Sequence, residues 1–162
     1  MVGEIRMPAK GRILVVDDDE SIRKMLMVIL QRSGYSVDAA ASGEEAIAKS
    51  DVNFYNLAVI DVRLPDMDGT KLLTLLKETS PRMMKIILTG YPVVENALQA
   101  INRGVDGYLT KPANVDQLLK TVAELLRRQA KEKTFTESQL KAYVETRLKE
   151  GRTIRRERLE EA

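Results

Sequence analysis

Three aspartates follow short apolar runs of the sequence, a position where carboxylates can do chemistry at the end of a buried strand. Asp17 and Asp18 come after the run at residues 13–16, and Asp61 comes after the run at 57–60. Clustered carboxylates raise one another's pKa unless a cation lies among them. Because the chain has no His and no Cys, the ligands of such a cation would be oxygens, which favours Mg²⁺ or a similar hard ion. Asp61 could then act as a nucleophile that accepts a phosphoryl group.

Two further apolar runs end in groups that suit a phosphoryl group. The run at 85–88 is followed by Thr89 and Gly90, a hydroxyl beside a residue small enough to let an oxyanion approach. The run at 107–110 is followed by Lys111 and a proline, and a cis bond there would aim the ammonium into the same crevice. Phosphoryl transfer depends mainly on positioning and charge neutralisation, so Thr89 and Lys111 join Asp61 as candidate residues.

The elements that must position these residues alternate strictly between apolar runs and amphipathic segments. Helical spacing of apolar residues predicts the amphipathic segments, and runs that are apolar on both sides indicate strands of a parallel sheet covered on both faces. We expect strands at 13–16, 35–40, 57–60, 85–88 and 107–110, and helices at 20–33, from Ser42 onward, at 69–77, 94–103 and 114–129. Five such units predict an α/β, doubly wound five-stranded parallel sheet of order 2-1-3-4-5, the flavodoxin-like arrangement. The first and third strands are then neighbours, which brings the three aspartates together.

Composition excludes several classes of function. A chain of 162 residues fits one domain with an appendage. The absence of Cys excludes disulfides and thiol nucleophiles, and the absence of His excludes imidazole bases and a phosphohistidine on this chain. Residues 1–11 lack the apolar stretch of a signal peptide, and no run approaches the ~20 apolar residues of a membrane span. We therefore expect a soluble cytoplasmic protein without membrane partners.

Taken together, these motifs resemble the receiver domain of two-component response regulators over residues 12–129. Asp17 and Asp18 match the family's acidic pair, and Asp61, within Asp-Val-Arg-Leu-Pro-Asp-Met-Asp-Gly, matches its phospho-acceptor. The resemblance implies that Asp18, Asp61 and the backbone carbonyl of Arg63 bind Mg²⁺ directly, while Asp17 acts through water. We divide the chain into an N-terminal arm (1–11), a receiver domain (12–129) and a charged helical C-terminal extension (130–162).

The resemblance also implies a function. Thr89 matches the conserved hydroxyl, Lys111 the conserved lysine and Tyr108 the switch aromatic of the family. The implied protein is a switch rather than an enzyme, with only Mg²⁺-dependent self-phosphorylation and slow self-dephosphorylation. It accepts a phosphoryl group on Asp61 from a sensor histidine kinase or phosphotransfer protein and changes a surface that binds a downstream protein. A haloacid dehalogenase would need a second Asp two residues after the nucleophile, where this chain has Arg63.

Each of these residues also has a plain structural interpretation. Asp17 and Asp18 could be acids favoured at a helix N-terminus, although that leaves Asp61 unexplained. Thr89 could be a polar strand end, Tyr108 an aromatic at the edge of the core, and Lys111 a solvated surface lysine.

The C-terminal extension leaves three hypotheses open. A capping-box pattern at Thr136 and Gln139 predicts a separate helix that begins near residue 135 and ends at Gly151. The extension could dock on the receiver or pair with a second copy of the chain, or it could be a solvated linker. Alternatively, the protein could be a DNA-binding transcriptional regulator that uses the basic end of the extension, Arg152, Arg155, Arg156 and Arg158. Nucleic acid is the least favoured partner, because interspersed Glu residues dilute the charge and so short a segment builds no core of its own.

Overall fold

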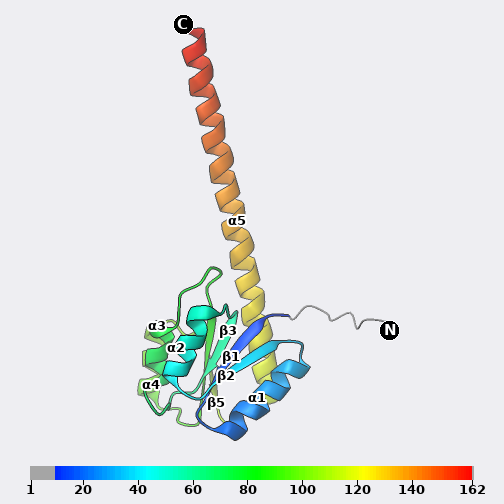
Figure 1. Ribbon diagram of the computed structural model, residues 1–162, viewed down its shortest axis with the longest axis vertical. Helices are drawn as coiled ribbons and strands as arrows, with labels where there is room; N and C mark the ends of the chain where they lie inside the picture. The colour runs from blue at the N-terminus through cyan, green and yellow to red at the C-terminus, as the bar shows by residue number, and fades with distance from the viewer. Residues whose placement is uncertain (1–9, 162) are drawn as a thin grey trace, which may run out of the picture.

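A five-stranded parallel sheet with helices on both faces and one very long final helix make up the computed structural model, which describes residues 10–161 (Figure 1). The strands run in the order β2-β1-β3-β4-β5, which confirms the predicted topology. Their bounds are β1 Arg12–Val16, β2 Ser36–Ala40, β3 Leu57–Ile60, β4 Met84–Thr89 and β5 Gly107–Thr110. The helices are α1 Glu20–Arg32, α2 Gly43–Val52, α3 Gly69–Leu75, α4 Val94–Asn102 and α5 Val115–Glu160.

Two apolar layers form the core, one on each face of the sheet. Alternate residues of a strand point to opposite faces, so Ile13 and Val15 of β1 pack against α1 and α5, while Leu14 and Val16 pack against α2, α3 and α4. All four side chains are buried. Burial on both faces explains why the strands read as uninterrupted apolar runs, and it makes the sheet a rigid platform for the residues at its edge.

The strand register places the acidic residues side by side. Val16 of β1 pairs with Ile60 of β3, so the chain reaches Asp17 and Asp61 at the same level of the sheet. The Asp61 N–H continues the ladder to the Val16 carbonyl at 2.9 Å, and the Asp17 N–H donates to the Ala40 carbonyl at 3.1 Å. The parallel pairing therefore fixes the backbone of both residues before their side chains make any contact.

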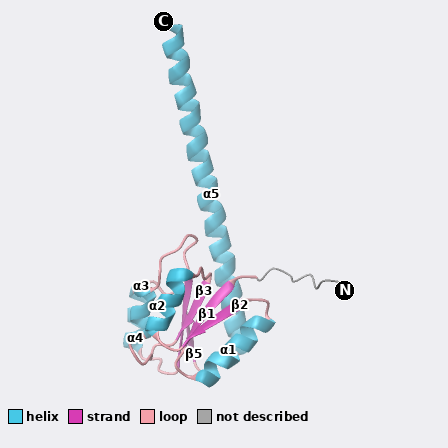
Figure 2. Ribbon diagram, viewed as in Figure 1, coloured by secondary structure: helices cyan, strands magenta, loops and turns pink. Residues whose placement is uncertain are grey.

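The predicted break in the last helix is wrong. Figure 2 shows α5 as one helix from Val115 to Glu160, without the separate start near residue 135 or the end at Gly151. The Thr136 hydroxyl donates to the Glu132 carbonyl at 2.9 Å, as it does inside a helix, instead of capping a new one. Gly151 has no positive φ, unlike Gly34 and Gly104. One Gly without any Pro from residue 115 to 160 weakens a helix but does not end it.

One of the alternatives left open for the extension, docking on the receiver, is contradicted by the exposure of its residues. Gln129 is the last buried residue of α5, and every residue from 130 to 161 is exposed. Figure 1 shows this part of α5 projecting away from the sheet. We call residues 130–160 the tail. The expected N-terminal arm at residues 1–11 falls mostly outside the described residues. No helix within residues 10–161 has the length and apolar character needed to cross a membrane.

Gln129 fastens α5 at the point where the helix leaves the receiver. Its side chain is only 4% exposed. The Gln129 amide N–H groups donate to the carbonyls of Asn56 at 2.9 Å and Arg82 at 2.8 Å, and the Gln129 side-chain carbonyl accepts from Asn56 Nδ2 at 3.1 Å. These bonds join α5 to the segments that precede β3 and β4, so the direction of the tail is fixed relative to the sheet.

Candidate functional site

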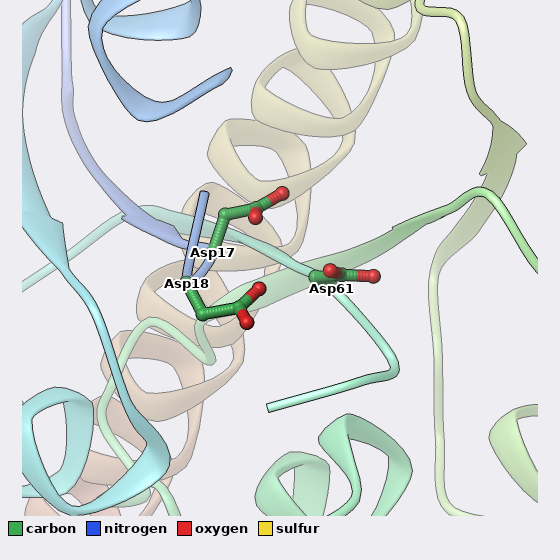
Figure 3. A group of neighbouring side chains, drawn as sticks. All are labelled: Asp17, Asp18 and Asp61. Atoms are coloured by element: carbon green, nitrogen blue, oxygen red, sulfur yellow. The ribbon is translucent and has the colours of Figure 1, made fainter. Parts of the chain in front are cut away.

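The three predicted aspartates meet at the carboxyl edge of the sheet. Figure 3 shows Asp17 and Asp18 leaving the end of β1 and Asp61 leaving the end of β3. One carboxylate oxygen of each lies within 4.8 Å of the others. Asp17 and Asp61 are buried, whereas Asp18 is exposed. We call this group the acidic site. The acidic site therefore combines two buried carboxylates with one that solvent reaches.

Lys111 places a positive charge among these carboxylates. Its Nζ lies 2.6 Å from Asp17 Oδ2 and 3.2 Å from Asp61 Oδ2. The Lys111 N–H donates to the Thr89 carbonyl at 2.8 Å, which fixes its backbone at the end of β5, and the Lys111–Pro112 bond is cis. The interpretation of Lys111 as a solvated surface lysine is therefore wrong.

Burial and pairing shift the pKa values in the acidic site. Burial raises the pKa of Asp61, although the Lys111 ammonium opposes that rise. Burial by itself would lower the pKa of Lys111, but the hydrogen bond to Asp17 and the charges of both carboxylates raise it overall. Lys111 therefore stays charged, and it helps to keep the buried Asp61 carboxylate ionised.

The composition of the acidic site fits a divalent cation. Three carboxylates around one ammonium leave an excess of negative charge, and all the converging ligand atoms are oxygens. Such a donor set is typical of sites for hard ions. The exposed position of Asp18 would leave such an ion open to solvent on one side. Arg63 lies in the loop after β3, where its backbone N–H opposes the rise in the pKa of Asp61.

Gly69 lets helix α3 begin directly against the phospho-acceptor candidate. A Cβ on Gly69 would lie 1.9 Å from the Asp61 carbonyl oxygen, a distance that excludes every other residue. Asp68 caps α3 by accepting from the Thr70 N–H at 2.8 Å. Asp66 accepts from the N–H groups of Gly43 and Glu44 at the start of α2. Asp66 and Asp68 are therefore cap residues that hold the loop after Asp61.

Thr89 and Tyr108 lie on neighbouring strands beside the acidic site. Thr89 ends β4, is fully buried, and its Oγ1 accepts from the Tyr91 N–H at 3.0 Å. Tyr108 pairs with Ile87 and packs against the layer formed with α2, α3 and α4. Its hydroxyl is buried without a hydrogen-bond partner among the described residues, and burial raises its pKa. An unpaired buried hydroxyl costs free energy, so this position of Tyr108 is poorly stabilised.

Sequence reasoning missed one contact near the acidic site. The Arg63 guanidinium lies over the Tyr91 ring, 3.4 Å from its centroid, and so joins the loops after β3 and β4. Such a cation–π contact is worth about 0.5–1 kcal/mol where both groups are exposed. A signal was available: Arg63 stands two residues after Asp61, and Tyr91 stands two residues after Thr89, on adjacent parallel strands.

Comparisons with known proteins identify the family to which this pattern corresponds. The family described as "Response regulator receiver domain" matches residues 13–123. The transcriptional regulatory protein ZraR of Salmonella typhimurium is 38% identical over 114 residues, which make up 70% of this chain and 26% of ZraR. The chain thus spans about a quarter of the length of that curated relative.

Solved structures show the same similarity. A CheY-like receiver domain protein from Methanospirillum hungatei is 45% identical, with a TM-score of 0.72 over 75% of this chain and 97% of that one. A Burkholderia pseudomallei response regulator, solved with a phosphorylated aspartic acid and a calcium ion, is 32% identical, with a TM-score of 0.66 over 76% and 73%. The beryllofluoride-activated NtrC4 receiver domain dimer is 38% identical, with a TM-score of 0.68 over 73% and 98%.

Proposed function

Because the chain belongs to the response regulator receiver domain family, we propose that it is a phospho-accepting switch with Asp61 as the phospho-acceptor. The phosphoryl donor in this proposal is a sensor histidine kinase or a phosphotransfer protein. One observation carries it: Asp61 is held beside Asp17, Asp18 and Lys111 at the carboxyl edge of the sheet. The family consists of phosphorylation-driven signalling switches, not of enzymes with a turnover substrate.

The proposed transfer assigns one task to each residue. An oxygen of the Asp61 carboxylate attacks the phosphorus, and the bond from phosphorus to the donor nitrogen breaks. Lys111 is close enough to Asp61 to neutralise an oxygen of the incoming group, and Asp17 holds that ammonium in place. Asp18, Asp61 and the Arg63 carbonyl would hold Mg²⁺ directly, with Asp17 acting through water. The ion, when bound, neutralises phosphoryl charge.

The proposed signal leaves the acidic site through Thr89 and Tyr108. A phosphoryl group on Asp61 gives the Thr89 hydroxyl a stronger acceptor, so this hydroxyl turns toward the phosphoryl group and releases the Tyr91 N–H. Tyr108, whose hydroxyl lacks a partner among the described residues, shifts with it, and the surface of α4, β5 and α5 changes. Phosphorylation must favour the active state by a few kcal/mol to move this equilibrium appreciably. Thr89→Ala would abolish the effect of phosphorylation on partner binding, and an unchanged effect would rule out this coupling.

The partners follow from the same proposal. The output is binding to a downstream protein, in the cytoplasm, where the kinase domains of sensors lie. A second copy of the chain is a further candidate partner, since a relative forms a receiver domain dimer.

Intact mass spectrometry after incubation with acetyl phosphate and Mg²⁺ tests the proposal. We expect the wild-type chain to gain the mass of one phosphoryl group and Asp61→Asn to gain none. No gain in the wild-type protein, or an equal gain in both, would contradict it.

Regulation of transcription through the tail is a second candidate. Its support is the name of the relative ZraR and the four exposed arginines at residues 152, 155, 156 and 158. Residues 130–160 form part of a single helix, and its arginines would contribute phosphate contacts whose strength falls as the salt concentration rises. A gel-shift titration with salt, with and without the tail, separates this candidate from the first.

A further inference from the structure

The tail carries large apolar side chains that nothing within residues 10–161 covers. Apart from Phe135, which lies on the other side of the helix, six of them are between 46% and 72% exposed. They lie mostly along one side of the helix and, with Gly151 and Arg155 between them, form what we call the tail stripe: Leu140, Tyr143, Val144, Leu148, Gly151, Ile154, Arg155 and Leu159. A bare helix with such a stripe is marginal in water, because helices in proteins gain most of their stability from packing an apolar side.

The tail stripe lies on the same side of α5 as the residues that face the sheet. Eighteen residues make about five whole turns of α-helix. Leu140 therefore lies directly above Val122, and Tyr143 lies directly above Leu125, where Val122 and Leu125 are buried against the receiver. A helix that packs on the tail stripe must consequently run along the receiver's side of α5.

Six of the eight tail-stripe residues, all except Tyr143 and Ile154, have a spacing that is the same from either end. Leu140, Val144, Leu148, Gly151, Arg155 and Leu159 are separated by steps of four, four, three, four and four residues. A second copy running in the opposite direction therefore meets it position by position. Leu140 lies opposite Leu159, and Leu148 lies opposite Gly151. Arg155 lies opposite Val144, where its aliphatic stem can cover the apolar side chain while the guanidinium reaches water.

Gly151 supports this pairing. Gly is a poor helix former, and here it stands in the interior of α5, where a Cβ added to it would meet no atom within 4 Å. Within one copy it therefore serves no packing purpose. Opposite Leu148 of an antiparallel second copy, the missing side chain leaves room for the leucine and lets the two helices approach closely.

The receiver itself selects the antiparallel orientation. In a parallel pair whose tail stripes face each other, both receivers would lie between the two helices. Each receiver would then overlap the other copy. In an antiparallel pair the two receivers lie at opposite ends of the paired helices. Each receiver is then next to the C-terminal end of the other copy's tail. The Gln129 bonds keep α5 in its position on the sheet, so the tail cannot turn to relieve the overlap of a parallel pair.

We propose that the tail stripe is a dimerisation surface on which a second copy of this chain packs antiparallel. The proposal does not depend on phosphorylation of Asp61, and the contact uses the tail rather than the surface that α4, β5 and the receiver part of α5 form.

Size-exclusion chromatography with light scattering on the full chain tests the surface. We expect the wild-type protein to have twice the monomer mass of 18.2 kDa and Leu148→Glu to return to 18.2 kDa. Ala142→Glu is the matched control, because residue 142 is about 200° around the helix from Leu140; this variant should remain a dimer. A monomeric wild-type protein, as expected if the tail pairs with a different protein, overturns the proposal. Equal behaviour of the two variants also overturns it.

Cysteine cross-linking tests the orientation, since the chain has no Cys of its own. In the double variant Leu140→Cys with Leu159→Cys, oxidation should join two copies into a covalent dimer. In Leu140→Cys alone, the two thiols of an antiparallel pair are about 28 Å apart along the helix, and no covalent dimer should form. A covalent dimer of the single variant indicates a parallel pair and overturns the proposal, as does the absence of cross-links in both variants.

Discussion

The acidic site and the tail both concentrate charged side chains, but they hold them in opposite ways. In the acidic site, Asp17 and Asp61 are buried, and Lys111 bonds both of them at 2.6 and 3.2 Å. In the tail, ion pairs such as Lys133–Glu137 join side chains that are more than half exposed. Lys111 of the acidic site pairs with carboxylates far away in the sequence, whereas the ion pairs of the tail join residues three or four positions apart. Substitutions of the same kind should therefore have large effects in one region and small effects in the other.

The largest difference is expected between two glycines. Gly69→Ala would put a Cβ 1.9 Å from the Asp61 carbonyl oxygen, and relief of that clash must move the backbone at the acidic site. We expect a loss of about 3 kcal/mol or more in the free energy of unfolding. Gly151→Ala in the tail meets no atom within 4 Å and should leave the unfolding of the receiver unchanged. Urea denaturation of the two variants measures both values, and similar losses would contradict the distinction.

The ion pairs of Lys111 in the acidic site and of Lys133 in the tail provide the next comparison. Lys111→Ala leaves the buried carboxylates of Asp17 and Asp61 without their counter-charge, which we expect to cost about 2–3 kcal/mol in the free energy of unfolding. Lys133→Ala breaks an exposed pair whose atoms are 4.0 Å apart and should cost less than about 0.5 kcal/mol. Chemical denaturation without Mg²⁺ gives both numbers. If Lys111→Ala were as mild as Lys133→Ala, the acidic site would be more hydrated than its burial indicates.

Gln129 marks the boundary between the two regions. Gln129→Ala removes the donors that satisfy the Asn56 and Arg82 carbonyls, with an expected cost of about 2 kcal/mol. Arg128→Ala, its exposed neighbour, should change stability by less than about 0.5 kcal/mol. Thermal unfolding of the two variants tests whether the fixed part of α5 extends to Gln129. Equal midpoints would show that it ends earlier.

The smallest expected effect is stabilisation by Mg²⁺. At ten times its Kd, a ligand that binds only the folded state adds about 1.4 kcal/mol to the free energy of unfolding. We expect this gain in the wild-type chain and in Leu148→Glu, and its loss in Asp18→Asn, since Asp18 belongs to the acidic site. Unfolding curves at increasing Mg²⁺ concentration provide the comparison. A gain that survives in Asp18→Asn would place the ion elsewhere.

The same difference between the two regions explains what the sequence could predict. Apolar runs that end in Asp17, Asp61, Thr89 and Lys111 predicted the sheet order and the meeting of the carboxylates, because parallel strands bring their carboxyl ends to one edge. The contact of Arg63 with Tyr91 was missed, because their positions after neighbouring strands are a weak signal and the contact depends on the paths of two loops.

The prediction of a separate helix in the tail failed for a different reason. A capping-box pattern at Thr136 and a Gly at position 151 are local signals, and each is weak. In a segment without Pro, the hydrogen bonds of a continuous helix outweigh both of them. The hydrogen bonds of Gln129 could not be predicted either, since its partners Asn56 and Arg82 are far away in the sequence.

The central claim is that the acidic site accepts a phosphoryl group on Asp61, and intact mass after incubation with acetyl phosphate and Mg²⁺ tests it most directly. Asp66→Asn is the matched control, because Asp66 follows in the same loop but caps α2. The account predicts one added phosphoryl group on the wild-type chain, on Asp66→Asn and on the tail variant Leu148→Glu, and none on Asp61→Asn. A phosphoryl group on Asp61→Asn, or none on the wild-type chain, would contradict it.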